Sequence, residues 1–491
     1  VEVFDVNTDT EQEGEVSDDE QFEIPNKVPR VPSFKSKDGT VWKQHYPPKA
    51  VRTRQCNIVT HLQGVKPCAR GAKTPIECWS LFFDDDTLNV ILENTNLYIN
   101  KCSKNYSRER SAKPKDIIEI KALIGLLYLG GVLKSARLCT DELCDRNGCG
   151  VERFWLTMSK DRFLFLLRHL WFDNTETRDD RKKCDKFAAI RQVFQMFLEN
   201  CKRSYTIGEF ATVDEMLEAF RGRCSFLQYM PKKPNKYGLK FFSLVDAKTW
   251  YVLNMEPYVG QQPEGPFRAK NYPRSIVERL IEPISGTGRN ITCDNWFTSF
   301  PLITSLLSTH RTTCVGTVRK NKRELPKEFV ETKTRPVGSS IFGFQEDTTI
   351  VSFVPKKGKN VILASSMHHD DTIDSSIGDK NKPEIVTFYN STKGGVDVVD
   401  KLCAAYDVAR NTRRWPMVIL YALLNIAGIN SQVIYIFNNQ MKNSVRRMYL
   451  KELAIGLTDD HLKRRVALTK LPREVREKRQ EVAGTSSQHI K

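Results

Sequence analysis

The chain has 491 residues, and because one domain usually spans roughly 100–200 residues, we expect about two to four structural units. Hydrophobic residues make up 40% and charged residues 27%, which suits a soluble protein with buried cores. This composition excludes collagen-like, coiled-coil and globally disordered chains, and the net charge of +17 excludes an acidic protein.

The charge is unevenly distributed along the chain. The first 25 residues carry ten Asp or Glu and no Lys or Arg, which leaves about +27 on the remainder. A body that basic favours nucleic acid as its partner, because each neutralised phosphate releases a counterion. A solvated basic surface and an anionic lipid surface are the alternatives. We predict that residues 1–62 form a disordered acidic N-terminal arm and linker.

Helical periodicity begins near residue 75 and continues to about residue 200. Apolar residues recur every three to four positions in the segments 76–92, 116–133, 153–170 and 187–198. We therefore predict four helices in this part of the chain, with a basic, polar connection at 101–115.

The apolar period changes near residue 210, where short β-rich runs begin. Strands are predicted at 210–217, 239–246, 250–258, 289–295 and 312–318, with a helix at 300–307. Residues 320–385 contain further β-like runs at 349–354 and 361–365 and predict a small inserted β unit. From Gly395 onward the pattern is helical again.

Two features of the remaining sequence indicate where in the cell the protein is located. Residues 417–437 are long enough to cross a membrane, but four polar residues interrupt the run, so we predict a buried helix and no membrane. The thirteen Cys form no C-x-x-C pair, which indicates a reduced, intracellular protein. Cys139, Cys144 and Cys149 lack a neighbouring His, so we predict no zinc site.

An aspartate ends or follows each of three short apolar segments: Asp214, Asp294 and Asp397. Strand ends present side chains to a cleft, and three carboxylates meeting there would repel one another without a cation. Oxygen ligands favour Mg²⁺ or Mn²⁺, and two such ions can clamp both oxygens of a phosphoryl displacement. The alternative is that these aspartates cap helices, with Asp397 as an N-cap.

The sequence around these aspartates strongly resembles the piggyBac transposases over about residues 65–460. The similar segments are TVDEML (212–217), FRGRC (220–224), YMPKKP (229–234), KYG (236–238), NITCDNWFTS (290–299), VGTVR (315–319), NKRE (321–324), YN (389–390), KGGVD (393–397), RWP (414–416) and NIA (425–427). These segments are long and specific.

The resemblance implies a mixed α/β fold, with an RNase H-like catalytic core of the DDE/D class. The implied units are a helical dimerisation and DNA-binding domain in two parts (63–209 and 407–470), the core in two parts (210–319 and 386–406), a β-rich insertion (320–385) and a basic tail (471–491). It also implies a homodimer.

By the same resemblance, Asp214, Asp294 and Asp397 match the three catalytic, metal-binding aspartates, and Asp400 matches a supporting acid. The implied cofactor is Mg²⁺ or Mn²⁺, as two ions. The implied reaction is a nick at the transposon end, attack of the freed 3′-hydroxyl on the other strand to close a hairpin, and joining of the reopened 3′-ends to a TTAA target.

Six side chains are candidates for DNA contact: Arg221, Arg223, Arg319, Lys322, Arg323 and Trp415. Arg221 and Arg223 could contact a phosphate near the scissile bond or pair with local acids. The other three basic residues match a family segment that handles target DNA, although a solvated loop is the alternative. Trp415 and Trp296 could stack on a splayed base or lie in the core.

The family's usual C-terminal tail is Cys-rich and binds zinc, whereas no Cys follows Cys403 here, so we expect that module to be absent. A domesticated DNA-binding or chromatin protein without transposition activity is therefore the alternative function. A scaffold acting through the acidic arm is a third possibility. Basic residues at 463–465 and 478–479 are spaced like a bipartite nuclear localisation signal and predict a nuclear protein.

Overall fold

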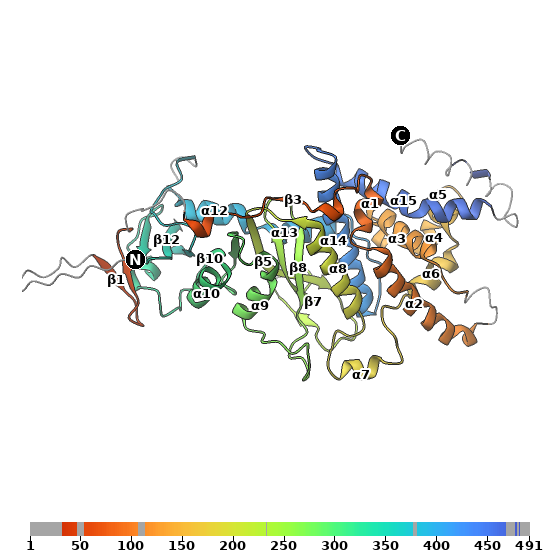
Figure 1. The fold of residues 1–491 in the computed structure, drawn as a ribbon, viewed down its shortest axis with the longest axis horizontal. Coiled ribbons are helices and arrows are strands. Elements are labelled where there is room, and N and C mark those ends of the chain that lie inside the picture. The colour runs from red at the N-terminus through yellow and green to blue at the C-terminus, as the bar shows by residue number, and fades with distance from the viewer. Residues whose placement is uncertain are drawn as a thin grey trace, which may run out of the picture.

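The computed structural model describes residues 32–46, 54–106, 113–231, 233–376, 381–467, 477–478 and 481. The molecule is elongated, with a large sheet running from one end into the middle and a layer of helices at the other end (Figure 1). The acidic segment at 1–25 lies outside the described residues.

Helices of 4 to 18 residues form the first part of the helical layer, and five of them begin with a side-chain cap. They are α1 (Pro75–Ser80), α2 (Asp85–Cys102), α3 (Ile117–Val132), α4 (Thr140–Leu143), α5 (Glu152–Thr157), α6 (Lys160–His169), α7 (Arg178–Lys182) and α8 (Arg191–Ser204). The single helices predicted at 76–92 and 153–170 are wrong, because each is two helices. Asp84 accepts from the backbone N–H of Thr87 and Ser159 from that of Arg162, so each caps a new helix start.

One mixed sheet of eleven strands crosses the described chain, in the order β1-β2-β11-β12-β13-β10-β9-β5-β7-β6, with β8 also paired to β7. Its strands are β1 (Ser33–Lys35), β2 (Val41–Lys43), β5 (Phe210–Ala219), β6 (Gln228–Tyr229), β7 (Tyr237–Asp246), β8 (Val252–Pro257), β9 (Asn290–Cys293), β10 (Thr313–Thr317), β11 (Ser340–Phe344), β12 (Thr349–Lys356) and β13 (Lys359–Ser365). A separate ladder joins β3 (Gly64–Val65) to β4 (Tyr205–Thr206).

The middle of the sheet changes strand direction at β5. Strands β8, β7 and β5 run antiparallel, whereas β5, β9 and β10 run parallel. The five strands predicted between residues 210 and 318 are confirmed, including the hairpin of β7 and β8.

The β runs predicted at 349–354 and 361–365 are also confirmed, but they do not form a separate sheet. β13 pairs with β10, with Val315 opposite Ser365, so β11 to β13 extend the core sheet. The domain boundaries themselves stay a prediction.

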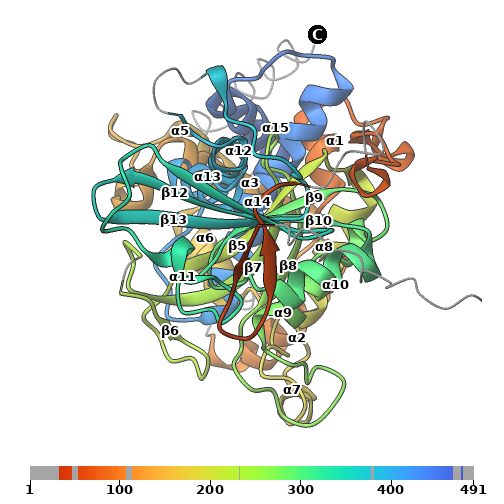
Figure 2. The same ribbon diagram turned by 90° about the vertical axis from the view of Figure 1, so that its left-hand side faces the viewer.

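An N-terminal hairpin extends the same sheet, which corrects the expectation of a disordered arm for residues 32–46. β1 pairs with β2, and Lys43 of β2 lies opposite Phe344 of β11. Trp42 is fully buried, its ring lies 5.5 Å from that of Phe300, and its Nε1 donates to the carbonyl oxygen of Glu324 at 2.9 Å. Figure 2 looks onto this end of the molecule, with the hairpin in the foreground.

The later helices cover the sheet and complete the helical layer. They are α9 (Pro273–Leu280), α10 (Phe300–His310), α11 (Lys327–Val330), α12 (Glu384–Thr392), α13 (Gly395–Ala405), α14 (Trp415–Asn438) and α15 (Arg446–Val466). Short 3₁₀ helices lie at Gln55–Asn57, Pro67–Ala69, Ser103–Asn105, Ser135–Arg137 and Glu282–Ile284.

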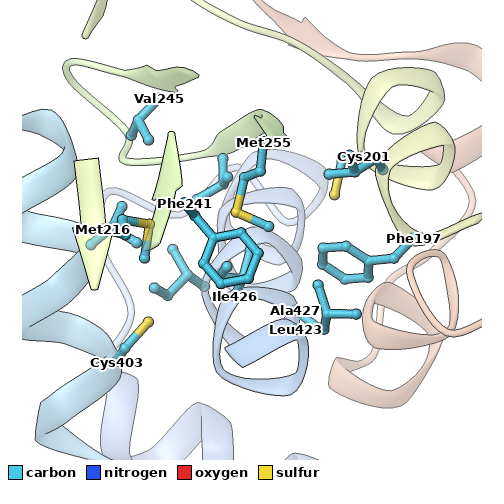
Figure 3. Close-up of a cluster of buried hydrophobic side chains, with 14 of the residues drawn as sticks. Phe197, Cys201, Met216, Phe241, Val245, Met255, Cys403, Leu423, Ile426 and Ala427 are labelled. Carbon is cyan, nitrogen blue, oxygen red and sulfur yellow. The ribbon is translucent and has the colours of Figure 1, made fainter. Parts of the chain in front are cut away.

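A buried hydrophobic cluster joins α8, α13 and α14 to one face of the sheet (Figure 3). Phe241 and Met216 are direct partners on β7 and β5, and they meet Ile426 of α14 in this cluster. α14 is long and apolar enough to cross a membrane, but its apolar window is wholly buried inside the protein. The burial confirms the predicted core helix.

The helices before and after the core pack against each other. α3 and α15 lie so close that a Cβ on Gly125 would come within 2.8 Å of the side chain of Thr458. Tyr128 of α3 accepts from Trp79 Nε1 at 2.9 Å and donates to the carbonyl oxygen of Leu424 at 2.5 Å. These buried bonds tie α1, α3 and α14 together, so segments some 300 residues apart in sequence form one layer.

Candidate active site

The register of β5 and β9 places two of the three predicted aspartates side by side. Val213 lies directly opposite Cys293 in this parallel pair, so Asp214 and Asp294 follow neighbouring positions. Asp294 follows the end of β9, as expected. Asp214 does not end its strand, because β5 continues to Ala219 and Asp214 pairs with Ser243 of β7 in mid-strand. The expectation of a strand end is therefore wrong for Asp214.

Asp397 reaches this point through the junction of α12 and α13. Thr212 on β5 donates to the carbonyl oxygen of Thr392 at 2.6 Å, and the hydroxyls of Thr292 and Thr392 lie 2.7 Å apart. A Cβ on Gly395 would come within 2.5 Å of the Thr212 hydroxyl, so only glycine permits this approach. The first turn of α13, which carries Asp397, is thereby fixed over β5.

None of these three aspartates is a helix cap, because the helix that follows Asp294, α10, is capped by Ser299. Asp294 Oδ1 accepts from the backbone N–H of Trp296 at 2.8 Å, which closes a turn and orients the carboxylate. Asp397 is not an N-cap, because Gly394 occupies that position. Asp214 accepts from the backbone N–H of Glu215 at 2.8 Å and lies inside a strand.

The carboxylates affect one another electrostatically. The pKa of Asp214 is raised to about 7. Burial is the main cause, the charges of Glu215, Asp294 and Asp397 contribute to the rise, and the hydrogen bond from the Glu215 N–H opposes it. Burial also raises the pKa of Asp400 to about 6, although the Lys233 ammonium opposes this rise. The site is therefore rich in carboxylates and poor in positive charge.

Two further residues lie beside these carboxylates and were not assigned a role from the sequence. Glu218 lies four residues after Asp214 on the same face of β5, and burial raises its pKa to about 8, with Asp400 and Asp407 adding to the effect. Lys233 Nζ donates to the carbonyl oxygen of Glu215 at 3.1 Å and lies 3.6 Å from Asp400 Oδ2. The alternation of side chains along a strand could have predicted Glu218, but no local pattern predicts Lys233.

The family of the chain follows from comparison with known proteins. Residues 74–432 match the family model described as Transposase IS4. The cryo-EM structure of a piggyBac transposase synaptic complex with hairpin DNA is 37% identical to this chain, with a TM-score of 0.80. The match covers 86% of this chain and 88% of that chain. The chain belongs to the piggyBac transposase family.

Curated relatives of this piggyBac-family chain include two proteins of Homo sapiens. PiggyBac transposable element-derived protein 3 is 24% identical over 371 residues, which cover 72% of this chain and 60% of that protein. PiggyBac transposable element-derived protein 2 is 24% identical over 370 residues, which cover 70% and 58%. The chain thus spans about 60% of the length of the curated relatives it matches.

The structural match confirms the fold class. The mixed α/β architecture is that of the piggyBac transposase, and the antiparallel strands β8, β7 and β5 followed by the parallel strands β9 and β10 are consistent with an RNase H-like core. In that core the three aspartates lie on β5, after β9 and on the helix packed over them.

The donor chemistry of the piggyBac-family site fits a hard divalent cation. The described residues contain no group of three His, Cys, Asp or Glu side chains close enough together to hold a metal ion. The charges of Asp294 and Asp397 nonetheless raise the pKa of Asp214, and a dication would offset this repulsion. These residues would hold Mg²⁺ or Mn²⁺, and their catalytic role stays a prediction.

The basic DNA-contact candidates are free of ion pairs within the described part of the chain. Arg221 and Arg223 are exposed and pair with no acid there, so the alternative of local salt bridges is not observed. Arg221 also lines a groove of about 760 Å³ beside Glu218. Arg319 Nε donates to the carbonyl oxygen of Asn295 at 3.0 Å, which places it beside the turn that holds Asp294. Lys322 and Arg323 lie in the turn after β10.

The aromatic candidates are mostly packed. Trp415 is half-buried, with its ring 5.6 Å from Phe187 and 5.0 Å from Phe226. Trp296 stacks on Phe242 at 5.4 Å, and Lys240 Nζ lies 5.0 Å above its ring. Both side chains thus contribute to the core, and their contact with DNA stays a prediction.

Proposed function

We propose that this chain is a DNA transposase that cleaves transposon ends through hairpin intermediates and joins them to TTAA target DNA. The observation that carries the proposal is the placement of Asp214 and Asp294 on neighbouring strands, with Asp397 on the helix packed over them, in the core of a piggyBac-family chain. A divalent cation bound by these carboxylates supplies Lewis acidity at the scissile phosphate.

The proposed reaction is a series of phosphodiester exchanges. In the first step a water oxygen bonds to phosphorus at the transposon end and the 3′-oxygen leaves as a hydroxyl. In the second step that hydroxyl attacks the opposite strand, one P–O bond forms as another breaks, and the end closes as a hairpin. Reopening by water and attack on TTAA complete the series. Arg221, Arg223, Arg319, Lys322 and Arg323 would hold phosphates during these steps.

The test uses the full chain with Mg²⁺ or Mn²⁺ and two labelled duplexes. One carries a TTAA-flanked terminal repeat and the other ends in a TTAA hairpin. The wild type should nick the first and open the second, whereas Asp294→Asn should do neither and still bind both. If wild type and Asp294→Asn are equally inactive while both bind DNA, the chain is a domesticated DNA-binding protein. The transposable element-derived names of the human relatives favour that second function.

We also propose a nuclear homodimer, as the function requires access to chromosomal DNA. Among the basic residues of the localisation motif, Arg464 pairs with Asp116 and Arg465 donates to the carbonyl oxygen of Leu156. Arg479 lies outside the described residues. Microscopy of the full chain with a fluorescent tag tests the location, and light scattering tests the dimer.

A further inference from the structure

Among the described residues, one cation forms an ion pair with the aspartates of the site, Asp214, Asp294, Asp397 and Asp400. Lys233 Nζ lies 3.6 Å from Asp400 Oδ2, and within the described ranges no other Lys or Arg forms an ion pair with any of the four aspartates. Lys240 is directed elsewhere: its Nζ lies 3.8 Å from Glu215 Oε2 and over the rings of Phe242 and Trp296.

The loop between β6 and β7 presents Lys233 to this position. The backbone N–H of Lys233 donates to the carbonyl oxygen of Met230 at 3.1 Å, and that of Met230 donates to Lys236 at 2.7 Å. The ammonium then donates to the carbonyl oxygen of Glu215, the residue after Asp214. Asp400 lies one helical turn after Asp397 on α13. Lys233 therefore lies between the strand and the helix that carry the site.

The ion pair between Lys233 and Asp400 is long and partly exposed, so it can separate at low cost. At 3.6 Å it is longer than a charge-assisted hydrogen bond, which is usually about 2.7–2.9 Å. The side chains of Lys233 and Asp400 are 23% and 32% exposed, so water can solvate both groups when they separate. A dication that approaches the site is attracted by the same carboxylates and repelled by the ammonium.

We infer that Lys233 is the counter-cation of the metal-free site, and that a divalent cation displaces it from Asp400 on binding. The inference rests on the proposed function. Lys233 is on this account a positioning residue: it holds Asp400 and α13 beside β5 until the metal arrives, and it lowers the affinity of the empty site for metal.

Direct metal binding tests this inference without DNA. The full chain is titrated with Mn²⁺, and free Mn²⁺ is measured by electron paramagnetic resonance. Lys233→Gln should bind Mn²⁺ about three- to tenfold more tightly than wild type, because the variant removes one positive charge several ångströms from a partly solvated site. Lys233→Arg keeps the charge and should bind like wild type.

The control variant is Lys236→Gln, which removes an equal charge from the same loop at an exposed residue that forms no ion pair in the described structure. Its Mn²⁺ affinity should match that of wild type. In an Asp400→Asn background, the effect of Lys233→Gln should shrink, because the two residues act as a pair. Thermal unfolding confirms that each variant folds.

The outcomes separate the two proposals. If wild type binds Mn²⁺ and Lys233→Gln binds it equally or more weakly, Lys233 is not a counter-cation and the proposed function stands. If Lys236→Gln gained as much Mn²⁺ affinity as Lys233→Gln, the gain would be a general effect of charge in this loop, and the inference would also be overturned. If wild type binds no more Mn²⁺ than Asp294→Asn does, the metal site of the proposed function fails, and this inference fails with it.

Discussion

The hydroxyl of Thr212 donates to the carbonyl oxygen of Thr392 at 2.6 Å, across a buried contact between residues 180 positions apart. This bond joins the central strand β5 to the end of α12 and so fixes the start of α13. Asp214 lies two residues after Thr212, and Asp397 lies five residues after Thr392. The relative positions of Asp214 and Asp397 therefore depend on an uncharged hydrogen bond between Thr212 and Thr392, and not on the carboxylates alone.

Gly395→Ala should disrupt that alignment. The new Cβ would lie 2.5 Å from the Thr212 hydroxyl, so α13 must shift, at a cost of about 1–3 kcal/mol in the free energy of unfolding. DNA nicking should fall by more than this loss of stability explains. Gly394→Ala is the matched control, because its Cβ would meet nothing within 4 Å. Equal nicking by the two variants would contradict the proposed placement of Asp397.

Asp214→Asn should stabilise the metal-free protein at alkaline pH. The pKa of Asp214 is about 7 in the folded chain against an ordinary value of 3.8, so the folded state holds this proton more tightly than the unfolded state. Stability therefore falls as pH rises through this window, and the full penalty is present above about pH 7.

Thermal unfolding at pH 8 should show Asp214→Asn more stable than wild type by on the order of 1–4 kcal/mol, with no difference near pH 3. Mg²⁺ should raise the unfolding temperature of the wild type at pH 8 and leave that of the variant unchanged. A less stable variant at pH 8 would show that Asp214 is paired with a cation in the metal-free protein.

His461 should make the helical layer sensitive to mild acid. Burial lowers the pKa of His461 to about 4, and Arg464 and Arg465 lower it further, whereas Glu119 raises it. Stability contributed by the neutral ring is present above about pH 6.5 and is lost as pH falls toward 4. His461→Gln should reduce the drop in unfolding temperature between pH 7 and pH 5. If the unfolding temperature of His461→Gln fell as much as that of wild type, the acid sensitivity would come from other groups, such as His368.

Trp42→Ala should detach the N-terminal hairpin from the sheet. The substitution removes a fully buried ring and the bond from Nε1 to Glu324, and such large-to-small changes cost about 3–5 kcal/mol. Limited proteolysis should then cleave near residues 36–40 first. Trp42→Phe keeps the ring but loses the hydrogen bond, so it should cost about 1–2 kcal/mol. Resistance of Trp42→Ala to proteolysis would argue that the hairpin is held by its backbone pairing.

The local sequence was sufficient for much of the fold and for the aspartates. The strands between residues 210 and 318 follow from apolar period and turn residues, because both act within a few positions. Asp214, Asp294 and Asp397 are recognisable from the segments that surround them. Where a cap interrupts the period, as at Asp84 and Ser159, the prediction merged two helices into one.

The sequence by itself determined the family, the positions of the strands between residues 210 and 318 and the candidate acids, since these depend on residues close together in the chain. Only the tertiary structure decided that Asp214 lies in mid-strand, that the hairpin at Trp42 joins the core sheet, and that Lys233 faces Asp400. Each of these depends on pairing between strands or on packing between segments far apart in sequence. Such contacts are set by the geometry of the whole core, which no local period encodes.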